Sequence, residues 1–534
     1  MKKWFLPLVV LLVVVFVISG CGTKETTTAP AQTTTATTAA KTTAATTPAK
    51  TTVTPKYGGS IKIIDTVGPG NSLGWLADPA ARLLAMWVNP MLEALLTCDL
   101  NGNFQGYLAE SFEVAPDLKS ITLKIRKGVL FHDGSTLNAE VVKWNFDMLI
   151  AAKLANLIDF ASVDQVDEYT VRFNLKNYSN TILSDLTTNW IVSKAAYDKA
   201  GGGQAGADYL RWNPVGTGPF KFVEFKRDAY IKWVKFDNYW QKGKPYLDAM
   251  EMDFVTDPVT RQTAFLSGQV DAEGGVMGQQ DADLVARGYK VEYTFDGGMT
   301  LIPDSANPTS PFAKLEVRQA MDYAIDREAI AKARGFGFWF PVSQWAIPNT
   351  YMWVKDLQPR AFNPAKAKEL LTAAGYPNGF EIKLLSNADA DTRVALQGML
   401  ANVGVKVTLE QTDMGSWVNY STKGWQNAFL FGPSAFASNH NKGFSYNLSK
   451  SSIQWKSLVK PDDIEQMYLA SRASRNIDAA MVQKWVRAIF DQCEVLPLYN
   501  TTRGDILQKY VHGTNFYTQA SFISWTPADT WMDK

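Results

Sequence analysis

Histidine and cysteine, the side chains that most often bind metal ions or act as nucleophiles, are scarce in this chain of 534 residues. The three histidines, His132, His440 and His512, lie far apart, and none of the three cysteines belongs to a Cys-x-x-Cys pair. Paired spacing of that kind is typical of metal sites and redox motifs. We therefore expect no metal ion and no cofactor, and we interpret each histidine as a surface or turn residue.

Two short segments resemble catalytic motifs without completing them. Gly216–Pro219 (Gly-Thr-Gly-Pro) lacks the lysine and the helix start that a phosphate-binding loop requires. Gly432–Ser434 (Gly-Pro-Ser) lacks the second glycine of a Gly-x-Ser-x-Gly turn. The sequence thus predicts no catalytic residue and a protein that is not an enzyme. A secreted glycan hydrolase, with two carboxylates supplied by distant segments, is the alternative.

Charge and aromatic content indicate which ligands suit the chain. The 53 basic and 52 acidic side chains give a net charge of +1, so nucleic acid is not an expected partner. The 17 tryptophans, 20 tyrosines and 28 phenylalanines exceed what cores usually need. Their flat faces could bind a neutral solute. At about 100–200 residues per domain, the length suggests two to four domains.

The N-terminal residues are typical of an exported lipoprotein. Lys2 and Lys3 precede the apolar run Phe5–Ile18, which is shorter than the about 20 residues that span a bilayer. The run ends in Ile18–Cys21, which resembles a lipobox, so residues 1–20 are a predicted signal peptide. We expect Cys21 to carry the lipid that anchors the protein to the outer face of the cell membrane.

Residues 21–56 form the predicted tether between that anchor and the folded part. Residues 23–56 are mostly Thr, Ala, Pro and Lys, a composition that does not offset the entropy of ordering. The two remaining cysteines, Cys98 and Cys493, are expected to be buried free thiols. A disulfide between them is the alternative in an oxidising compartment.

Strands and helices are predicted to alternate after residue 57, which favours an α/β fold. Strands are expected at 60–64, 121–125, 170–175, 217–223, 230–236, 250–254, 380–385 and 405–409. Helices are expected at 80–96, 138–149, 317–333, 364–374, 391–402, 462–471 and 479–493. Asn363 is the predicted N-cap of helix 364–374, with Pro364 in its first turn and Gly375 after its end. Arg318 and Asp326 would lie on one face of helix 317–333 and could form a surface or interlobe pair.

Several motifs follow one another from about Tyr57 to Trp531. They are Tyr57–Lys62, the segment 91–150 with Leu108–Ser111 and Arg126–Gly134, then Gly216–Phe220, Asn238–Trp240, Val317–Ala320, Ala324–Ile330 and Phe362–Phe380. In this order and spacing the chain resembles the family 5 extracellular solute-binding proteins, the receptors of ABC importers for peptides, nickel and some oligosaccharides. The motif residues are typical of scaffold, because Gly216 and Gly218 permit close backbone approach and Asp133-Gly134 predicts a tight turn.

The resemblance implies a periplasmic-binding-protein-like α/β fold with two lobes, a cleft and three domains. Lobe I would combine residues 57–82, 213–295 and 497–534, with an inserted domain at 83–212, and lobe II would be 296–496. The chain would cross between the lobes twice, as in a class II-type hinge. Closure is then a hinge motion that only a ligand touching both lobes can drive.

The resemblance also implies a function and partners. We expect a monomer that captures a small solute, a peptide or an oligosaccharide, and delivers it to an ABC permease and its ATPase. The alternative is a receptor that senses the ligand and docks a membrane signalling partner.

The ligand site is expected around residues 426–437. In peptide-binding members this segment supplies an arginine, a tryptophan and an aspartate that pairs with the peptide's amino group. The matching positions are Leu430, Pro433 and Phe436. A buried ammonium without a partner is costly, so ordinary peptides are disfavoured and neutral solutes are favoured. The candidate ligand-binding residues are Trp417, which matches a tryptophan of the family, and Phe431, Ser434, Phe436, Asn439, Trp345 and Trp75.

Overall fold

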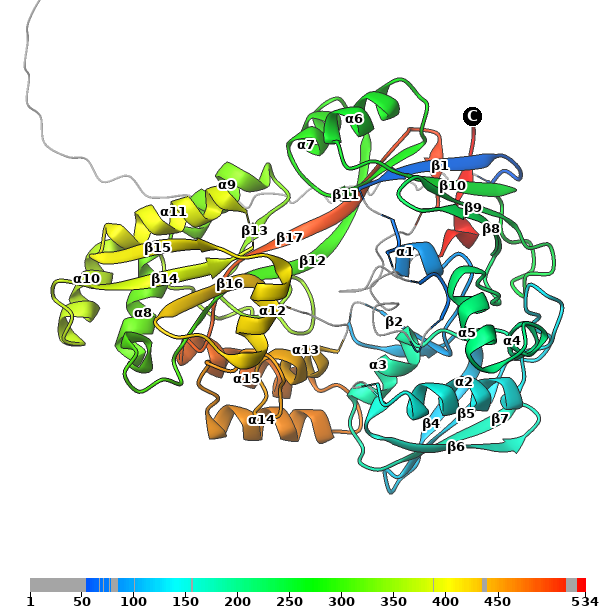
Figure 1. Cartoon of the computed structure of the whole chain (residues 1–534), viewed down its shortest axis with the longest axis horizontal. Coiled ribbons are helices and arrows are strands. Elements are labelled where there is room, and N and C mark those ends of the chain that lie inside the picture. The colour runs from blue at the N-terminus through cyan, green and yellow to red at the C-terminus, as the bar shows by residue number, and fades with distance from the viewer. Residues whose placement is uncertain are drawn as a thin grey trace, which may run out of the picture. The chain divides into compact units, whose positions relative to one another are not determined.

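Two long antiparallel strands, β12 (Lys290–Pro303) and β17 (Leu496–Leu507), run through the middle of the main sheet (Figure 1). The computed structural model describes residues 54–534 except 67, 71, 76, 78–84, 100, 155–156, 388, 435–438 and 515–525. Within these residues the main sheet has eleven strands in the order β15-β14-β16-β12-β17-β11-β1-β10-β9-β8, with β13 (Phe340–Pro341) paired to β17. Both halves of the sheet are therefore built on the same two strands.

The part of the sheet beyond β17 is the first lobe. Its strands are β11 (Ala272–Val276), β1 (Ser60–Asp65), β10 (Ala249–Phe254), β9 (Tyr230–Lys235) and β8 (Phe220–Lys226). The helices α6 (Pro258–Leu266) and α7 (Gln279–Ala286) lie beside β11 in Figure 1. Ile64 and Ile506 of the sheet share a small core with Phe265 and Leu284 of these helices.

The part of the sheet beyond β12 is the second lobe. Its strands are β16 (Ala428–Ser434), β14 (Phe380–Ser386) and β15 (Val405–Gln411). Its helices are α8 (Leu315–Ala324), α9 (Arg327–Gly335), α10 (Pro364–Ala373), α11 (Ala390–Ala401), α12 (Met414–Lys423), α13 (His440–Asn447), α14 (Asp462–Ala473) and α15 (Ala479–Asp491). Buried side chains form two clusters in this lobe, one around Trp345 and Trp485 and one around Leu301 and Phe431.

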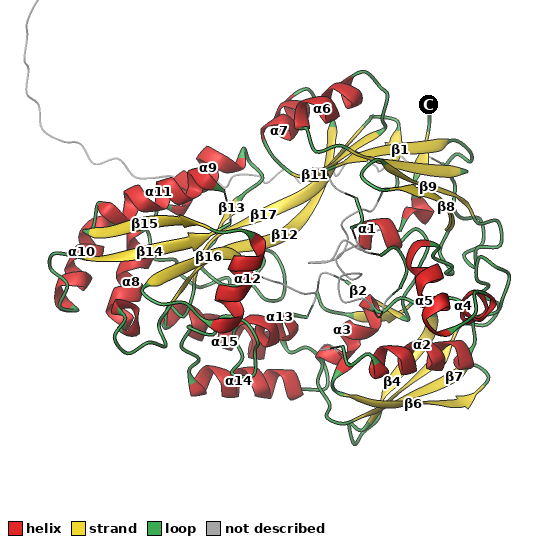
Figure 2. Cartoon of the chain, in the orientation of Figure 1, coloured by secondary structure: helices red, strands yellow, loops and turns green. Residues whose placement is uncertain are grey.

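A smaller sheet and the helices packed on it share a core with the first lobe, and together they are called the insert. Among the described residues it has four strands, β4 (Ala109–Val114), β5 (Ser120–Ile125), β7 (Thr170–Leu175) and β6 (Phe160–Asp167). Its helices are α2 (Ala139–Ala151), α3 (Thr181–Thr188), α4 (Lys194–Lys199) and α5 (Gly203–Trp212), seen in Figure 2. The smaller elements are α1 (Ala85–Val88), β2 (Leu96–Cys98), β3 (Phe104–Gly106), β18 (Val511–His512), β19 (Trp531–Met532) and the 3₁₀ turns Pro311–Ala313 and Pro527–Asp529. Phe146 and Phe173 of the insert belong to the same core as Ile61 and Trp233 of the first lobe.

Most predicted elements are confirmed, and two helices are wrong in length. The Asn363 side chain accepts from the Lys366 N–H, Pro364 lies in the first turn of α10, and Gly375 has a φ of +91°, as predicted. The predicted helix 80–96 is longer than the helix that the structure shows. The described part of this range contains only α1, which is followed by turns and by the start of β2. Its described apolar positions, from Met86 to Leu96, are buried in the first-lobe core, and a segment buried on all sides can show the spacing of a helix.

The predicted helix 317–333 is broken into α8 and α9, because Asp326 caps a new helix by accepting from the Ala329 N–H. The predicted Arg318–Asp326 pair is therefore wrong. Arg318 is buried and donates to the main-chain oxygens of Gln492 and Cys493, the residues just before β17. A motif arginine thus fixes the point where the chain enters the shared strand.

The buried carboxyl group of Glu93 joins two of the sequence motifs. It accepts hydrogen bonds from Thr217 Oγ1 at 2.8 Å, Tyr239 Oη at 2.8 Å and Trp240 Nε1 at 2.9 Å. Burial raises the pKa of Glu93, and these hydrogen bonds oppose that rise. The Gly-Thr-Gly-Pro and Asn-Tyr-Trp motifs are therefore held together by one acidic side chain that sequence reasoning did not single out.

The glycines on either side of Thr217 are required by the same contact. A Cβ atom at Gly216 would lie 2.2 Å from the Met91 carbonyl oxygen, and one at Gly218 would lie 2.5 Å from that of Pro90. The predicted close backbone approach is confirmed. It is made against the segment that carries Glu93.

Replacing Glu93 by alanine should destabilise the fold strongly. The change leaves the buried donors of Thr217 and Tyr239 and the partly buried donor of Trp240 without this acceptor, and each buried group left unpaired costs about 1–3 kcal/mol. We expect the free energy of unfolding to fall by at least about 3 kcal/mol in chemical denaturation. The exposed Glu113 of β4 is the matched control, with an expected change within about 0.5 kcal/mol for Glu113→Ala. Equal effects at the two positions would contradict this role for Glu93.

Candidate functional site

The strands β12 and β17 carry the chain between the lobes at a point where their pairing is irregular. The register shifts between Phe295 and Gly297 of β12, which marks a β-bulge. A Cβ atom at Gly297 would meet nothing nearer than 3.7 Å, so packing does not require glycine there. The bulge and this glycine together give β12 a local site for bending between its first-lobe and second-lobe halves.

Three predicted site residues lie on or against β16, next to β12. The Phe431 ring is fully buried in the second-lobe core. Trp417 of α12 is buried, and its Nε1 donates to the Phe431 carbonyl oxygen at 3.1 Å. Ser434 Oγ donates to the Gly298 carbonyl oxygen at 3.0 Å, which ties the end of β16 to the part of β12 just after the bulge. Ser434 thus connects the predicted ligand segment to β12.

Packing explains the glycine in this segment. A Cβ atom at Gly432 would lie 2.6 Å from the Trp417 ring, so only glycine fits. Leu430 is buried in the core and Pro433 is exposed, so the described segment 428–434 offers no charged group to a ligand. Leu430 and Pro433 stand where peptide-binding members are expected to have arginine and tryptophan, so this segment has neither the positive charge nor the indole ring.

Trp345 and Asn439 lie on either side of His440. The His440 ring stacks on the rings of Trp345 and Trp485, with centroid distances of 4.7 Å and 4.8 Å, and the two tryptophan rings also contact each other at 6.1 Å. Burial lowers the pKa of His440 to about 3, so the ring is neutral at physiological pH. The prediction of a surface or turn histidine is wrong for His440, which is buried. Its neighbours in the sequence are polar, so the sequence did not indicate that the ring would pack against distant aromatic side chains.

The last two predicted residues lie elsewhere. Trp75 is buried in the first-lobe core and stacks on Tyr197 at a centroid distance of 5.6 Å. Phe436 falls outside the described residues. The structure thus brings Trp417, Phe431 and Ser434 together, links Trp345 to Asn439 through His440, and places Trp75 apart from them. Ligand contact by each of these residues stays a prediction.

Asn439 is part of a contact between the second lobe and the insert. Its Nδ2 donates to the main-chain oxygen of Asn180 at 2.9 Å and to the side-chain oxygen of Asn180 at 3.1 Å. Both asparagines are buried. Sequence reasoning missed Asn180, because an asparagine directly before a helix is typical of an ordinary N-cap.

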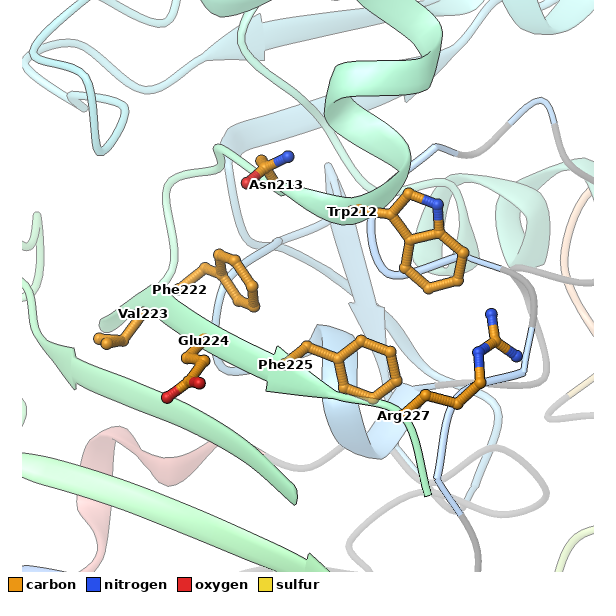
Figure 3. Close-up of a pocket in the computed structure, with 7 residues that line it drawn as sticks. All are labelled: Trp212, Asn213, Phe222, Val223, Glu224, Phe225 and Arg227. Carbon is orange, nitrogen blue, oxygen red and sulfur yellow. The ribbon is translucent and has the colours of Figure 1, made fainter. Parts of the chain in front are cut away.

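A cavity of about 490 Å³ opens on the first lobe and the insert beside the edge strand β8 (Figure 3). Its wall includes Trp212, stacked on Phe225 with 3° between the ring planes, and Arg227, whose guanidinium lies 5.3 Å from the Trp212 ring. Arg227 also donates to the Gly70 main-chain oxygen at 2.6 Å. All the lining residues come from residues 212–227, so a solute held by them alone could not draw the second lobe closed.

A second groove, lined by α11 and the edge strand β15, lies wholly in the second lobe and is limited in the same way. Among the described residues, no cluster of histidine, cysteine and carboxylate side chains could hold a metal ion. None of the described helices has the length and apolarity needed to cross a membrane. Cys98 and Cys493 are both buried thiols with no disulfide between them.

A buried carboxyl group lies where the second lobe passes into β17. Glu494 is 1% exposed, and burial raises its pKa to about 8, against an ordinary value of 4.5. The nearby positive charges of Arg318 and Lys460 oppose this rise, and the negative charges of Asp463 and Glu465 add to it. The acid that precedes the shared strand is thus largely protonated near neutral pH.

The stability of the protein should fall as Glu494 ionises. Because the folded-state pKa is raised, the stabilising effect is present below about pH 4.5 and is lost as the pH approaches 8. Relative to Glu494→Gln, the native protein should lose on the order of 4 kcal/mol between pH 5 and pH 8, measured by chemical denaturation. The exposed Glu140 of α2 provides the control substitution Glu140→Gln. A stability difference between native protein and Glu494→Gln that is the same at both pH values would contradict the prediction.

The fold is of the periplasmic-binding-protein class, a mixed α/β architecture with two lobes. It matches HbpA2 from Haemophilus parasuis with a TM-score of 0.76 at 20% identity, covering 89% of this chain and 100% of that one. Residues 103–455 match the family described as bacterial extracellular solute-binding proteins, family 5 Middle. The chain belongs to this family, as its ordered motifs predicted.

Two further proteins show the range of relatives. The glutathione-binding protein GsiB of Pectobacterium atrosepticum is 33% identical over 322 residues, which is 58% of this chain and 61% of that protein. The chain thus spans between 61% and 64% of the length of the curated relatives it matches. AgaA from A. tumefacien R10, solved in complex with agropinic acid, has a TM-score of 0.70 at 27% identity and covers 89% of this chain and 99% of that one.

Proposed function

We propose that this protein is the substrate-binding receptor of an ABC importer. It captures a small solute outside the cytoplasmic membrane, closes its two lobes around it and delivers it to a permease with its ATPase. Membership of the solute-binding family carries this proposal. The connection of both lobes through β12 and β17, with a bulge in β12, supports the hinge motion that capture requires.

The solute class that fits best is a small peptide-like or oligosaccharide-like molecule without a free amino group at the recognised end. Relatives that bind glutathione or agropinic acid support a small polar solute. The segment 428–434 supplies no carboxylate for an ammonium group, and the sequence places phenylalanine at position 436. The charges of Lys442 and Arg472 are already paired with Asp185 and Asp159.

The predicted site residues are retained as the candidate site. Ser434 and Asn439 are its described members at the two ends of residues 435–438. The Trp417 and Phe431 side chains pack under β16 and would act by fixing its position. A solute beside β16 would lie close to the hinge strand β12, with which β16 pairs.

The proposal includes the attachment and organisation of the chain. Residues 1–20 act as a signal peptide, Cys21 carries the lipid anchor, and residues 21–56 are the tether that lets a monomeric receptor reach the permease. We retain the boundaries 57–82, 213–295 and 497–534 for lobe I, 83–212 for its inserted domain and 296–496 for lobe II. The Phe295/Gly297 bulge lies at one proposed crossing and the start of β17 at the other.

Native mass spectrometry of the gently purified protein should reveal a bound solute. A solute of the proposed class should also raise the melting temperature, because a ligand at 100 times its Kd adds about 2.7 kcal/mol of stability. The sharpest comparison is a tripeptide against its N-acetylated form, tested beside glutathione and neutral oligosaccharides. The acetylated peptide should bind at least as tightly as the free-amine peptide, since the site offers its amino group no carboxylate.

The variant Trp212→Ala is the control for this test, because Trp212 lines the cavity beside β8. It should leave the solute-induced shift unchanged. Failure of every solute class to stabilise the native protein, with no co-purified molecule, would contradict the transport role. A strong preference for the free amine would contradict the proposed solute class alone.

A further inference from the structure

The side chain of Asn180 makes its hydrogen bonds away from its own helix. Asn180 is the N-cap of α3, a position where asparagine usually accepts from the first turn, yet its side chain forms no capping bond. Its Nδ2 donates to the Ser471 carbonyl oxygen at 2.8 Å and to Ser474 Oγ at 3.2 Å. Both partners belong to the second lobe, at and just after the end of α14.

The side-chain oxygen and the main-chain N–H of Asn180 also form hydrogen bonds with the second lobe. Its Oδ1 accepts from Asn439 at 3.1 Å and from Asn441 at 3.2 Å. Its main-chain N–H donates to the Arg472 carbonyl oxygen at 2.9 Å. The amide of Asn180 therefore finds its described partners in the second lobe, although the residue itself is part of the insert and is 1% exposed.

Two ion pairs lie on either side of Asn180. Lys442 of α13 contacts Asp185 of α3 at 2.8 Å, with the two side chains 13% and 4% exposed. Arg472 of α14 contacts Asp159, just before β6, at 2.6 Å, and its Nε donates to Ser179 Oγ at 2.9 Å. We call the eight residues Asp159, Ser179, Asn180, Asp185, Asn439, Asn441, Lys442 and Arg472 the seam.

The seam has the composition of an interface that can separate. Its members are polar or charged, whereas the hydrophobic core of the insert and that of the second lobe are separate clusters on its two sides. Interfaces between domains that move are more polar than permanent ones. The side chains of the seam could be solvated by water after separation, which a buried apolar interface could not achieve without a large penalty.

The seam and the hinge join the lobes at different elements. In Figure 1, α3 of the insert lies next to α13, and the insert sheet lies beside the end of α14, while β12 and β17 connect the lobes along the main sheet. The hydrogen bonds and ion pairs of the seam given above are all made between protein atoms, and among its eight members only Asn441 Oδ1 is a buried side-chain atom without a partner. The seam therefore stabilises the closed arrangement of the lobes without a solute between them.

We propose that the seam is a latch, centred on Asn180, that keeps the lobes closed for most of the time in the solute-free protein. The inference rests on the proposed receptor function for its biological meaning and concerns the regulation of that same site. A receptor that is mostly open binds its solute more weakly, because part of the binding free energy is used to close the lobes. The apparent Kd is the intrinsic Kd of the closed form divided by the fraction of solute-free molecules that are closed. The latch raises that fraction and so tightens capture, and its rupture would accompany solute release.

The test is the distribution of lobe positions in the solute-free full chain. Spin labels are placed at Val166→Cys of β6 and Ile453→Cys of the second lobe, which are 53% and 63% exposed. Cys21→Ser removes the lipid site, and Cys98 and Cys493 are buried. Pulsed electron spin resonance should give one dominant short distance for the parent. Asn180→Ala should raise the population of longer distances at least about fivefold, since it removes the side-chain partner of Asn441 and of the Ser471 carbonyl and leaves Asn439 only its bond to the main-chain oxygen.

A second variant and a control keep the test decisive if Asn180→Ala folds poorly. The double variant Lys442→Ala and Arg472→Ala removes both ion pairs from the other side of the seam and should open the lobes as well. Arg487→Ala, which removes an exposed ion pair with Asp356 inside the second lobe, should leave the distances unchanged. A solute-free parent as open as the variants, or folded variants as closed as the parent, would overturn the latch. Because no solute is present, either result leaves the proposed transport role standing.

Discussion

The structure depends on the pairing of β12 with β17. Each strand belongs to both lobes, so the lobes cannot separate without bending this pair. Its register shifts twice, between Phe295 and Gly297 and between Met299 and Thr300. Other features fix the ends of these strands. Arg318 holds the main-chain oxygens just before β17, and Ser434 bonds to Gly298 beside the bulge. The predicted ligand segment is therefore bonded to the strand that the two lobes share, which is the arrangement the proposed receptor needs if solute contact is to alter lobe position.

The motifs that identify the family serve the scaffold. Thr217, Tyr239 and Trp240 meet at Glu93, and Gly216 and Gly218 allow the chain to pass close enough to reach it. This scaffold role explains how a chain can match the family so clearly while its own ligand segment lacks the charged residues expected of peptide-binding members.

The sequence predicted local structure better than long-range contacts. The caps of α10, the strands β5 and β7 and the closeness at Gly216 follow from short-range steric rules, and they are confirmed. The break between α8 and α9 was missed because Asp326 has the same helical spacing whether it caps a helix or continues one. Asn180 and Glu93 could not be found from sequence, because their partners lie 259 and 124 residues away in the chain. For the candidate site, ligand contact stays a prediction, and residue type did not indicate that Trp345 and Phe431 would be covered by packing.

In the proposed receptor role, neither the cavity beside β8 nor the groove beside β15 could hold a solute against both lobes, since each is lined from one side of the β12–β17 pair. The solute must instead contact both lobes for its binding energy to favour closure. The most direct measurement is a crystal structure of the protein with the solute that co-purifies with it. The account predicts a solute in contact with residues of the first lobe and with the β16 segment, and an intact contact between Asn180 and Asn439. A solute seated only among Trp212, Phe225 and Arg227, with the second lobe swung away, would contradict it.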